Sequence, residues 1–276
     1  MDNFDKQKDK AKEFLSWLLH PISIDQFFSE YWGRKHLVMK NSKCKDCAGW
    51  MKDLFTWKDF SRYMNKYPKV DHLQILNFDD NDGRWCLFKI KNKEKGYEKQ
   101  PRYSKEAIWK MWYKGGKSFV IPIQEYHKKN ILDTAKYLEW FFNYMSANIY
   151  LSPKPSSKSF PPHADSTENF LFHTEGETKW TMYKEFGSFG GTTDKPLEVI
   201  DEFVLKPGDV LYIPTLQYHK AESVTPRISI SIHGKDKPGQ NLQNFKLGPV
   251  SRDEWYDWDF FRYNDEHNNR YKQKEK

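Results

Sequence analysis

The stretch that decides the fold is FVLKPGDVLYIP, residues 203–214, in which two short apolar runs flank a Pro-Gly pair. Residues 203–205 and 210–213 are rich in aromatic and β-branched side chains, which favour strands. Pro207 and Gly208 stand at the two central positions of a four-residue turn, where a type II turn needs a preset φ and then a positive φ. The stretch therefore predicts two strands joined by a tight turn.

The same strand-like composition extends to both sides of this turn. Further short runs with strand composition follow one another with turn residues and no helical pattern between them, at residues 147–151, 169–174, 179–183 and 228–232. Many short strands at close spacing predict an antiparallel sandwich or a small barrel.

The first 145 residues have a different pattern. Apolar side chains recur there at helical spacing in the segments 6–19, 25–33, 57–67 and 105–113. Short strands are predicted between them, near residues 36–39, 70–77, 85–90 and 118–121. We therefore expect a mainly helical N-terminal region, 1–145, that packs on a β core, 146–235, followed by a C-terminal tail, 236–276.

Composition limits the classes of function. Aromatic residues make up 17% of the 276 residues and hydrophobic residues only 38%, so the core must rely on rings, and we expect many of them to wall the pocket of the β core. The net charge of +7 comes from mixed charges, so it permits an acidic partner without requiring one. Basic runs such as 89–99 could contact RNA, although a solvated surface is the more common role.

Cysteine usage and the N-terminus bear on the compartment. Cys44, Cys47 and Cys86 cannot form a disulfide framework, which suits a reducing compartment. Cys44 and Cys47 have zinc or redox spacing, but a structural zinc site needs four ligands. The apolar stretch 14–19 is too short for a secretory signal or a membrane span. We expect a soluble, cytoplasmic protein without a membrane partner.

One group of residues has the pattern of a metal-binding site. His163 and Asp165 are two residues apart, so on an extended chain their side chains point to the same face. His219 follows the strand predicted at 210–213, and we expect it at the end of that strand. Two imidazoles and one carboxylate on one face of a metal form the facial triad of non-haem Fe(II) oxygenases. Without this context, a His-Asp pair would be read as a surface or turn pair.

Several motifs together are similar to one family. These motifs resemble the cupin-type JmjC oxygenases, and within them the ribosomal-protein hydroxylases. They are ANIYLSP at 147–153, PHAD at 162–165, EGETKWTMY at 175–183, and FVLKPGDVLYIP at 203–214 together with His219. The N-terminal segment FFSEYWGRKHLV at 27–38 resembles that subgroup as well. The resemblance implies a double-stranded β-helix, the jelly-roll barrel of cupins, in a mainly β chain with flanking helices.

The resemblance also implies a ligand set. His163, Asp165 and His219 match the residues that bind Fe(II), and the family uses O2 and 2-oxoglutarate as co-substrates. A basic residue inside the barrel holds the distal carboxylate of 2-oxoglutarate, yet the usual position of this base is occupied here by Thr178, with Lys179 one step later. One step along a strand reverses the face, so Lys179 should point away from the pocket unless the strand bulges.

Another strand offers a substitute. Arg227 and Ser229 resemble an Arg-x-Ser pair with which other 2-oxoglutarate oxygenases clamp this carboxylate, and a guanidinium can bind a carboxylate with two parallel hydrogen bonds. We favour Arg227 over Lys179 as the clamp, while a solvated arginine at a strand start stays an open alternative. Asn169 matches a polar pocket position in related asparaginyl hydroxylases, with ordinary structural hydrogen bonding as the alternative.

These features lead to two hypotheses. The first is an Fe(II)- and 2-oxoglutarate-dependent dioxygenase that hydroxylates a protein side chain, by resemblance on a ribosomal protein, and releases succinate. The second is a non-catalytic cupin-fold module that binds metal and associates with nucleic acid or the ribosome. The stretch after Gly234 is shorter than the dimerisation and winged-helix segments that ribosomal hydroxylases carry there, so we expect this chain to lack them.

Overall fold

The computed structural model describes most of the chain up to residue 235. The described residues are 3–40, 50–51, 54–66, 74–78, 85–87, 105–122, 128–142, 145–157, 160–187 and 195–235. The predicted tail, the basic run 89–99 and the pair Cys44 and Cys47 lie outside them.

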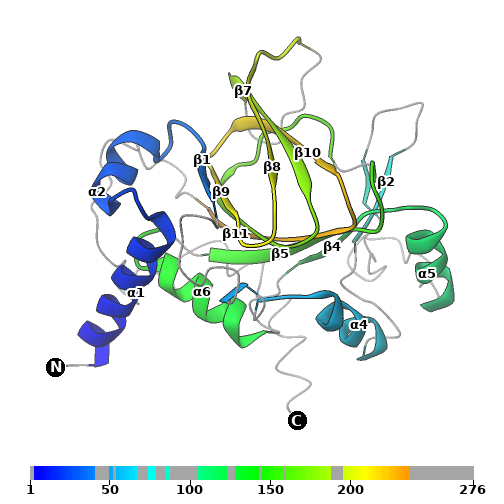
Figure 1. Cartoon of the computed structure of the whole chain (residues 1–276), viewed down its shortest axis with the longest axis horizontal. Helices are drawn as coiled ribbons and strands as arrows, with labels where there is room; N and C mark the ends of the chain where they lie inside the picture. The colour runs from blue at the N-terminus through cyan, green and yellow to red at the C-terminus, as the bar shows by residue number, and fades with distance from the viewer. Residues whose placement is uncertain are drawn as a thin grey trace, which may run out of the picture.

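Helices precede the strand-rich half of the chain (Figure 1). The helices are α1 (Asn3–Leu19), α2 (Ile24–Gln26), the π-helical turn η1 (Phe27–Tyr31), α4 (Trp57–Lys66), α5 (Lys105–Tyr113) and α6 (Lys129–Glu139). The early strands are β1 (Leu37–Met39), β2 (Gln74–Phe78), β3 (Trp85–Leu87) and β4 (Phe119–Pro122). The later strands are β5 (Met145–Ser152), β6 (Thr167–Glu175), β7 (Thr178–Phe186), β8 (Val199–Leu205), β9 (Val210–Ile213), β10 (Gln217–Ser223) and β11 (Arg227–Lys235).

The strands form two antiparallel sheets that face each other (Figure 1). The larger sheet has the order β1-β9-β6-β11-β5-β4-β2-β3, and the smaller has the order β10-β7-β8. This arrangement confirms the predicted double-stranded β-helix in a mainly β chain. Strands β1 to β4 come from the N-terminal region, so the larger sheet extends beyond residues 146–235, and the predicted domain boundaries stay a prediction.

Strand β11 shows how the sequence separates pocket from core. In the run RISISIH, Ile228, Ile230 and Ile232 are fully buried in the main hydrophobic core, whereas Arg227 and Ser231 line the interior of the barrel. Successive side chains of a strand point to opposite faces, so polar and apolar residues alternate. The apolar face of the larger sheet is covered by α1 and α6 (Figure 1).

The same alternation corrects the prediction that many of the aromatic side chains wall the pocket. Phe170, Phe172 and Tyr212 belong to the core between the larger sheet and the N-terminal helices, together with Phe27 and Trp32. Their neighbours along β6 point inward instead. Aromatic side chains therefore build the outer core, while the pocket takes only a few of them.

The region around the deciding turn follows the prediction in part. Gly208 has a φ of 98° and the Asp209 amide donates to the Lys206 carbonyl at 2.9 Å, as expected for a type II turn. His219, however, does not end the strand that begins at Val210. The chain turns at Leu216, which has a φ of 67°, and His219 lies on β10 in the other sheet. Strand β10 and helix α6 were not predicted.

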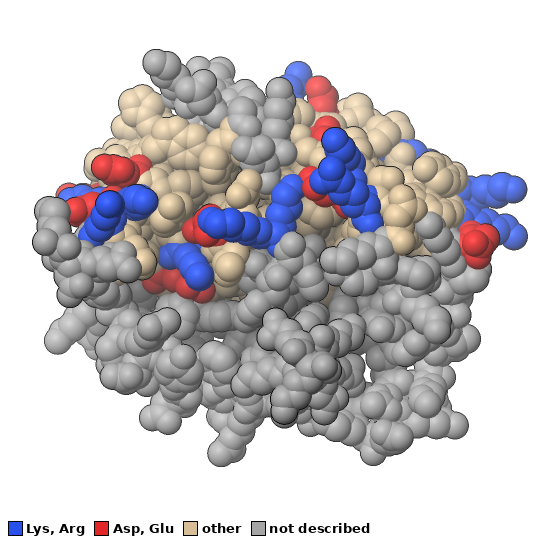
Figure 2. Space-filling model, turned by 90° about the horizontal axis from the view of Figure 1, so that it is seen from below, with Lys and Arg blue, Asp and Glu red and all other residues tan. Residues whose placement is uncertain are grey.

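Charges of both signs mix on the face that lies below the larger sheet. Figure 2 shows lysine and arginine next to aspartate and glutamate on the described part of this face. Ion pairs in the helical region include Lys128 with Asp59 at 2.6 Å and Arg62 with the same carboxylate at 4.0 Å. The described part of this face thus carries no continuous basic patch. In the described residues, none of the helices combines the length and the apolar character needed to cross a membrane.

Candidate functional site

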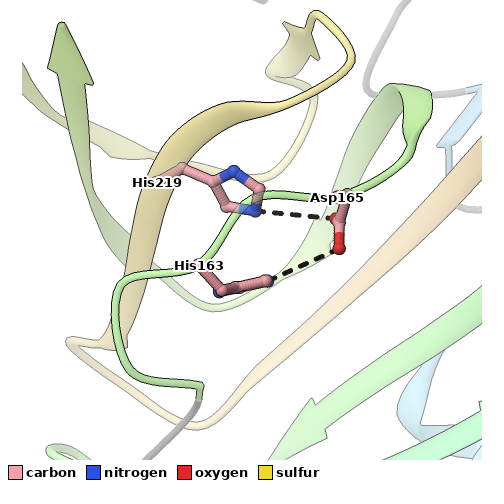
Figure 3. Close-up of side chains that lie close together, drawn as sticks. All are labelled: His163, Asp165 and His219. Carbon is pink, nitrogen blue, oxygen red and sulfur yellow. Dashed lines mark ion pairs between the residues drawn. The ribbon is translucent and has the colours of Figure 1, made fainter. Parts of the chain in front are cut away.

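His163, Asp165 and His219 converge at one end of the barrel (Figure 3). One ligand atom from each lies within 4.8 Å of the others. The Asp165 carboxylate faces both rings, with Oδ1 3.7 Å from Nε2 of His163 and Oδ2 3.6 Å from Nε2 of His219. Three donor atoms grouped on one side of a common point is the arrangement that a facial metal site needs.

The main chain holds the two histidines together. The His163 amide donates to the His219 carbonyl at 3.1 Å, and the His219 amide donates back at 2.9 Å. The Leu216 amide donates to the Asp165 carbonyl at 2.7 Å, which ties the turn before β10 to the third residue. The three side chains are therefore positioned by backbone pairing between segments about 50 residues apart in sequence.

Each imidazole is oriented by a carbonyl. Nδ1 of His163 lies 2.9 Å from the Pro161 carbonyl, and Nδ1 of His219 lies 2.9 Å from the Gln217 carbonyl. A carbonyl only accepts, so Nδ1 carries the proton in both rings and the Nε2 lone pair points toward Asp165. Burial, and next the proximity of His163, lower the pKa of His219, which favours the neutral form that a metal ligand needs. The donor set fits a divalent iron ion.

Asn169 supports the carboxylate. Its Nδ2 donates to Asp165 Oδ2 at 3.1 Å, and its Oδ1 accepts from the Ser231 hydroxyl at 2.5 Å. The Ser231 oxygen lies 3.2 Å from Nδ1 of His233. Because ligand carboxylates need a fixed orientation, Asn169 has the position of a residue that orients Asp165. This places the sequence-predicted Asn169 beside the triad.

A pocket continues from the triad into the barrel. Both sheets contribute to its lining, which consists of Tyr150, Phe160, His163, Asp165, Asn169, Leu171, Trp180, His219, Ala221, Arg227 and Ser231. The lining combines the triad at one end with apolar walls and a buried cation. Burial, and next the proximity of Asp165, raise the pKa of the Tyr150 phenol, so the tyrosine stays neutral.

Arg227 is the cation of this pocket, and its side chain is only 2% exposed. Its Nε donates to the Ser152 hydroxyl at 3.2 Å, and its Nη1 donates to the Ser229 hydroxyl at 3.2 Å. Burial lowers the pKa of Arg227 to about 10, because a charged guanidinium loses hydration there. An anion that enters the pocket would recover part of that lost solvation.

Lys179 points the other way. Its Nζ pairs with Glu202 at 2.8 Å on the outer face of β7, and its side chain is 43% exposed. The structure thus corrects its inclusion among the pocket residues, for the reason that the one-residue step predicts. Thr178 is buried on the same face of β7 as Trp180, and its hydroxyl has no hydrogen-bond partner among the described residues. Neither Thr178 nor Ser229 belongs to the described residues that line the pocket.

Sequence reasoning missed two features of this site. Ser231 lines the pocket, and its even spacing from Arg227 along β11 was the signal that could have identified it. Glu168 is 1% exposed and accepts hydrogen bonds from the Tyr212 hydroxyl and from the Thr215 hydroxyl, the latter at 3.0 Å. It fixes the turn that leads into β10. No local pattern distinguishes this glutamate from a solvated one.

Comparisons with known proteins agree with this geometry. The family model described as the JmjC domain matches residues 123–242. The bifunctional lysine-specific demethylase and histidyl-hydroxylase NO66 of Drosophila willistoni is 26% identical over 238 residues, which cover 82% of this chain and 28% of that protein. Ribosomal oxygenase 1 of Danio rerio is 25% identical and is covered to 40%. The chain therefore spans well under half the length of these two relatives.

Solved structures share the fold. The structure of YcfD, a ribosomal oxygenase from Escherichia coli, in complex with cobalt and 2-oxoglutarate superposes with a TM-score of 0.54 at 16% sequence identity. The match covers 79% of this chain and 53% of YcfD. The barrel, the triad and the family model agree: residues 123–242 match the JmjC domain, and the chain is similar to the ribosomal oxygenases.

Proposed function

We propose that this chain is an Fe(II)- and 2-oxoglutarate-dependent oxygenase that hydroxylates a protein side chain. The observation that carries the proposal is the pairing of a His-Asp-His triad with a buried arginine in one pocket. A metal site at one end and a cation further inside suit a ligand with a chelating group at one end and a carboxylate at the other. 2-Oxoglutarate has this shape.

Each residue then has a role that follows from its contacts. His163, Asp165 and His219 would hold the iron from one side, with the Nε2 atoms of both histidines facing it. Arg227 binds the distal carboxylate of 2-oxoglutarate, and Ser152 and Ser229 fix the guanidinium. Trp180, Leu171 and Phe160 keep water away from the reacting atoms.

Bound iron supplies the chemistry in which 2-oxoglutarate, O2 and a substrate C–H group give succinate, CO2 and a C–OH group. One oxygen atom of O2 enters succinate and the other enters the product. The chain contributes a facial ligand set, which leaves positions on the opposite side for the 2-oxo acid and O2. It also contributes oriented imidazoles and the apolar side chains that line the pocket.

The names of the relatives support a ribosomal protein as the substrate, because they include ribosomal oxygenases and a histidyl-hydroxylase. We place the protein in the cytoplasm on the basis of its cysteine usage.

To test this proposal, the protein is incubated with Fe(II), 2-oxoglutarate, O2 and ribosomal proteins. Succinate is quantified, and tryptic peptides are searched by mass spectrometry for one added oxygen atom. The proposal predicts substrate-dependent succinate release and one oxidised peptide, both lost in Asp165→Ala. Metal binding without any turnover of 2-oxoglutarate would instead favour the non-catalytic cupin module.

A further inference from the structure

A chain of hydrogen bonds runs behind Arg227, away from the pocket. Arg227 Nη1 donates to the Ser229 hydroxyl at 3.2 Å. The same hydroxyl lies 2.8 Å from Nδ1 of His173, and Nε2 of His173 lies 2.9 Å from the Gly176 carbonyl. His173 has 0% exposure and Ser229 has 2%, so water does not compete for these contacts.

The direction of each bond can be assigned. The Gly176 carbonyl only accepts, so the proton of the His173 ring is on Nε2. Burial, and next the neighbouring Arg227, lower the pKa of His173 to about 4, so the ring is neutral and Nδ1 is an acceptor. Ser229 must then donate its single hydroxyl proton to His173. Its oxygen lone pairs are consequently turned toward Arg227.

The far end of the chain is rigid. Gly176 has a φ of 73°, and a Cβ there would collide with the Pro226 carbonyl oxygen, immediately before Arg227. The next amide, of Glu177, donates to the Thr225 hydroxyl at 2.8 Å. The turn between β6 and β7 is thus packed against the start of β11, and the carbonyl that orients His173 is fixed relative to the arginine.

We propose that His173 is a positioning residue, which acts through Ser229 to hold Arg227 in the geometry that receives the distal carboxylate of 2-oxoglutarate. The inference rests on the proposed function. It assigns to His173 and Ser229, neither of which lines the pocket, an effect on co-substrate selectivity. A histidine that only filled the core would support the barrel as a whole and would not affect one end of the ligand alone.

The test compares two 2-oxo acids of similar size on the Mn(II)-loaded protein without O2. 2-Oxoglutarate has a distal carboxylate, whereas 2-oxopentanoate has a methyl group in its place. Isothermal titration calorimetry gives both dissociation constants. For the His173→Leu variant we expect about a tenfold loss of affinity for 2-oxoglutarate, in the range seen when a supporting partner of a binding residue is removed. The affinity for 2-oxopentanoate should stay within about twofold.

Two further variants sharpen the test. His173→Asn keeps an acceptor oxygen near the Nδ1 position, so it should restore most of the affinity for 2-oxoglutarate. Ser229→Ala removes one hydroxyl, breaks the same chain and provides the measurement if His173→Leu fails to fold. The double variant should lose no more than the stronger single one, because both changes interrupt one path to Arg227.

The outcomes separate the two claims. If the unmodified protein binds both 2-oxo acids equally, Arg227 does not receive the carboxylate, and the proposed function fails together with this inference. If the unmodified protein prefers 2-oxoglutarate and the variants at His173 and Ser229 keep that preference, only the positioning role is overturned. Equal losses for both acids would also overturn it, because they would indicate general damage to the barrel.

Discussion

His163 and His219 exchange two main-chain hydrogen bonds, so the two imidazoles of the triad are held as one antiparallel pair. The pair joins the segment before β6 to strand β10 of the other sheet. The site therefore forms only when the two sheets close over each other. Metal binding should depend on the side chains, while the pairing itself should survive their removal.

Substitution of the triad tests this separation. His219→Ala and Asp165→Ala should each weaken metal binding by at least about 100-fold, because two remaining donors hold a divalent ion poorly. Equilibrium dialysis against Mn(II) measures the loss. His20→Ala, at an exposed histidine in the N-terminal region, serves as the matched control and should bind metal normally. Normal binding by Asp165→Ala would show that the metal site lies elsewhere.

The predicted carboxylate clamp can be separated from the neighbouring lysine. Arg227→Gln should raise the dissociation constant for 2-oxoglutarate by about 10- to 150-fold, because hydrogen bonds to a charged partner contribute roughly 1.5–3 kcal/mol. Lys179→Gln should have no measurable effect, since its ammonium pairs with Glu202 outside the barrel. Calorimetry on the Mn(II)-loaded variants measures both constants. A large effect at Lys179 with none at Arg227 would reverse the assignment.

Asn169 should act on the metal through Asp165. Asn169→Ala removes the donor to Asp165 Oδ2, and we expect metal affinity to fall by about 10- to 100-fold, less than for Asp165→Ala. Asn169→Asp offers a sharper comparison, because it places a second carboxylate beside Asp165 and cannot donate when ionised. If Asn169→Ala bound metal as tightly as the unmodified protein, its contact with Asp165 would be structural only.

Glu168 tests the turn before β10. Glu168→Ala leaves the buried Tyr212 hydroxyl and the Thr215 hydroxyl without this acceptor, at roughly 1–3 kcal/mol each. We expect the free energy of unfolding to drop by about 2–6 kcal/mol in urea titrations. Glu198→Ala, at an exposed partner of Lys184, is the control and should leave the unfolding midpoint almost unchanged. Equal midpoints for both variants would contradict the role of Glu168.

Stability should depend on pH through His173. Its pKa is about 4 in the folded protein, against 6.5 for an ordinary histidine, because burial and next Arg227 disfavour the charged ring. Lys40 also lowers the pKa of His173, whereas Asp209 raises it. Between pH 6.5 and about 4 the unfolded chain binds the extra proton and the folded protein does not. Stability is therefore complete above pH 6.5 and falls below it, by up to about 1.4 kcal/mol per pH unit from this group.

His173→Asn isolates this contribution. Asparagine does not titrate in this range, so the slope of unfolding free energy against pH should be shallower in the variant than in the unmodified protein by this amount. Urea titrations at several pH values between 4 and 7 give both slopes. Identical slopes would mean that His173 is charged in the folded protein, and the assigned hydrogen-bond directions would then be wrong.

Local pattern predicted much of the fold because alternation along single strands is a local property. The run RISISIH places its isoleucines in the core and Arg227 inside the barrel, and the one-step offset placed Lys179 outside. The type II turn at Pro207 and Gly208 followed from residue types alone. The triad was identified by spacing and by resemblance to a family.

Features that depend on which segments pair could not be read in this way. Strand β10 was missed because QYHKAES is mostly polar and shows no apolar alternation, and its place is fixed by pairing with β7. Many rings were expected at the pocket, but the helices α1 and α6 cover the face of the sheet that carries Phe170 and Phe172. The roles of Glu168 and His173 depend on partners that are distant in sequence.

Anaerobic titration of the protein with Fe(II) and then 2-oxoglutarate tests the central claim most directly. A 2-oxo acid chelated to Fe(II) gives a weak visible charge-transfer band. We predict that the band appears at one equivalent of iron, requires both components and is absent in Asp165→Ala. If the unmodified, folded protein binds Fe(II) but shows no band at saturating 2-oxoglutarate, the assignment of this pocket to 2-oxoglutarate would be contradicted.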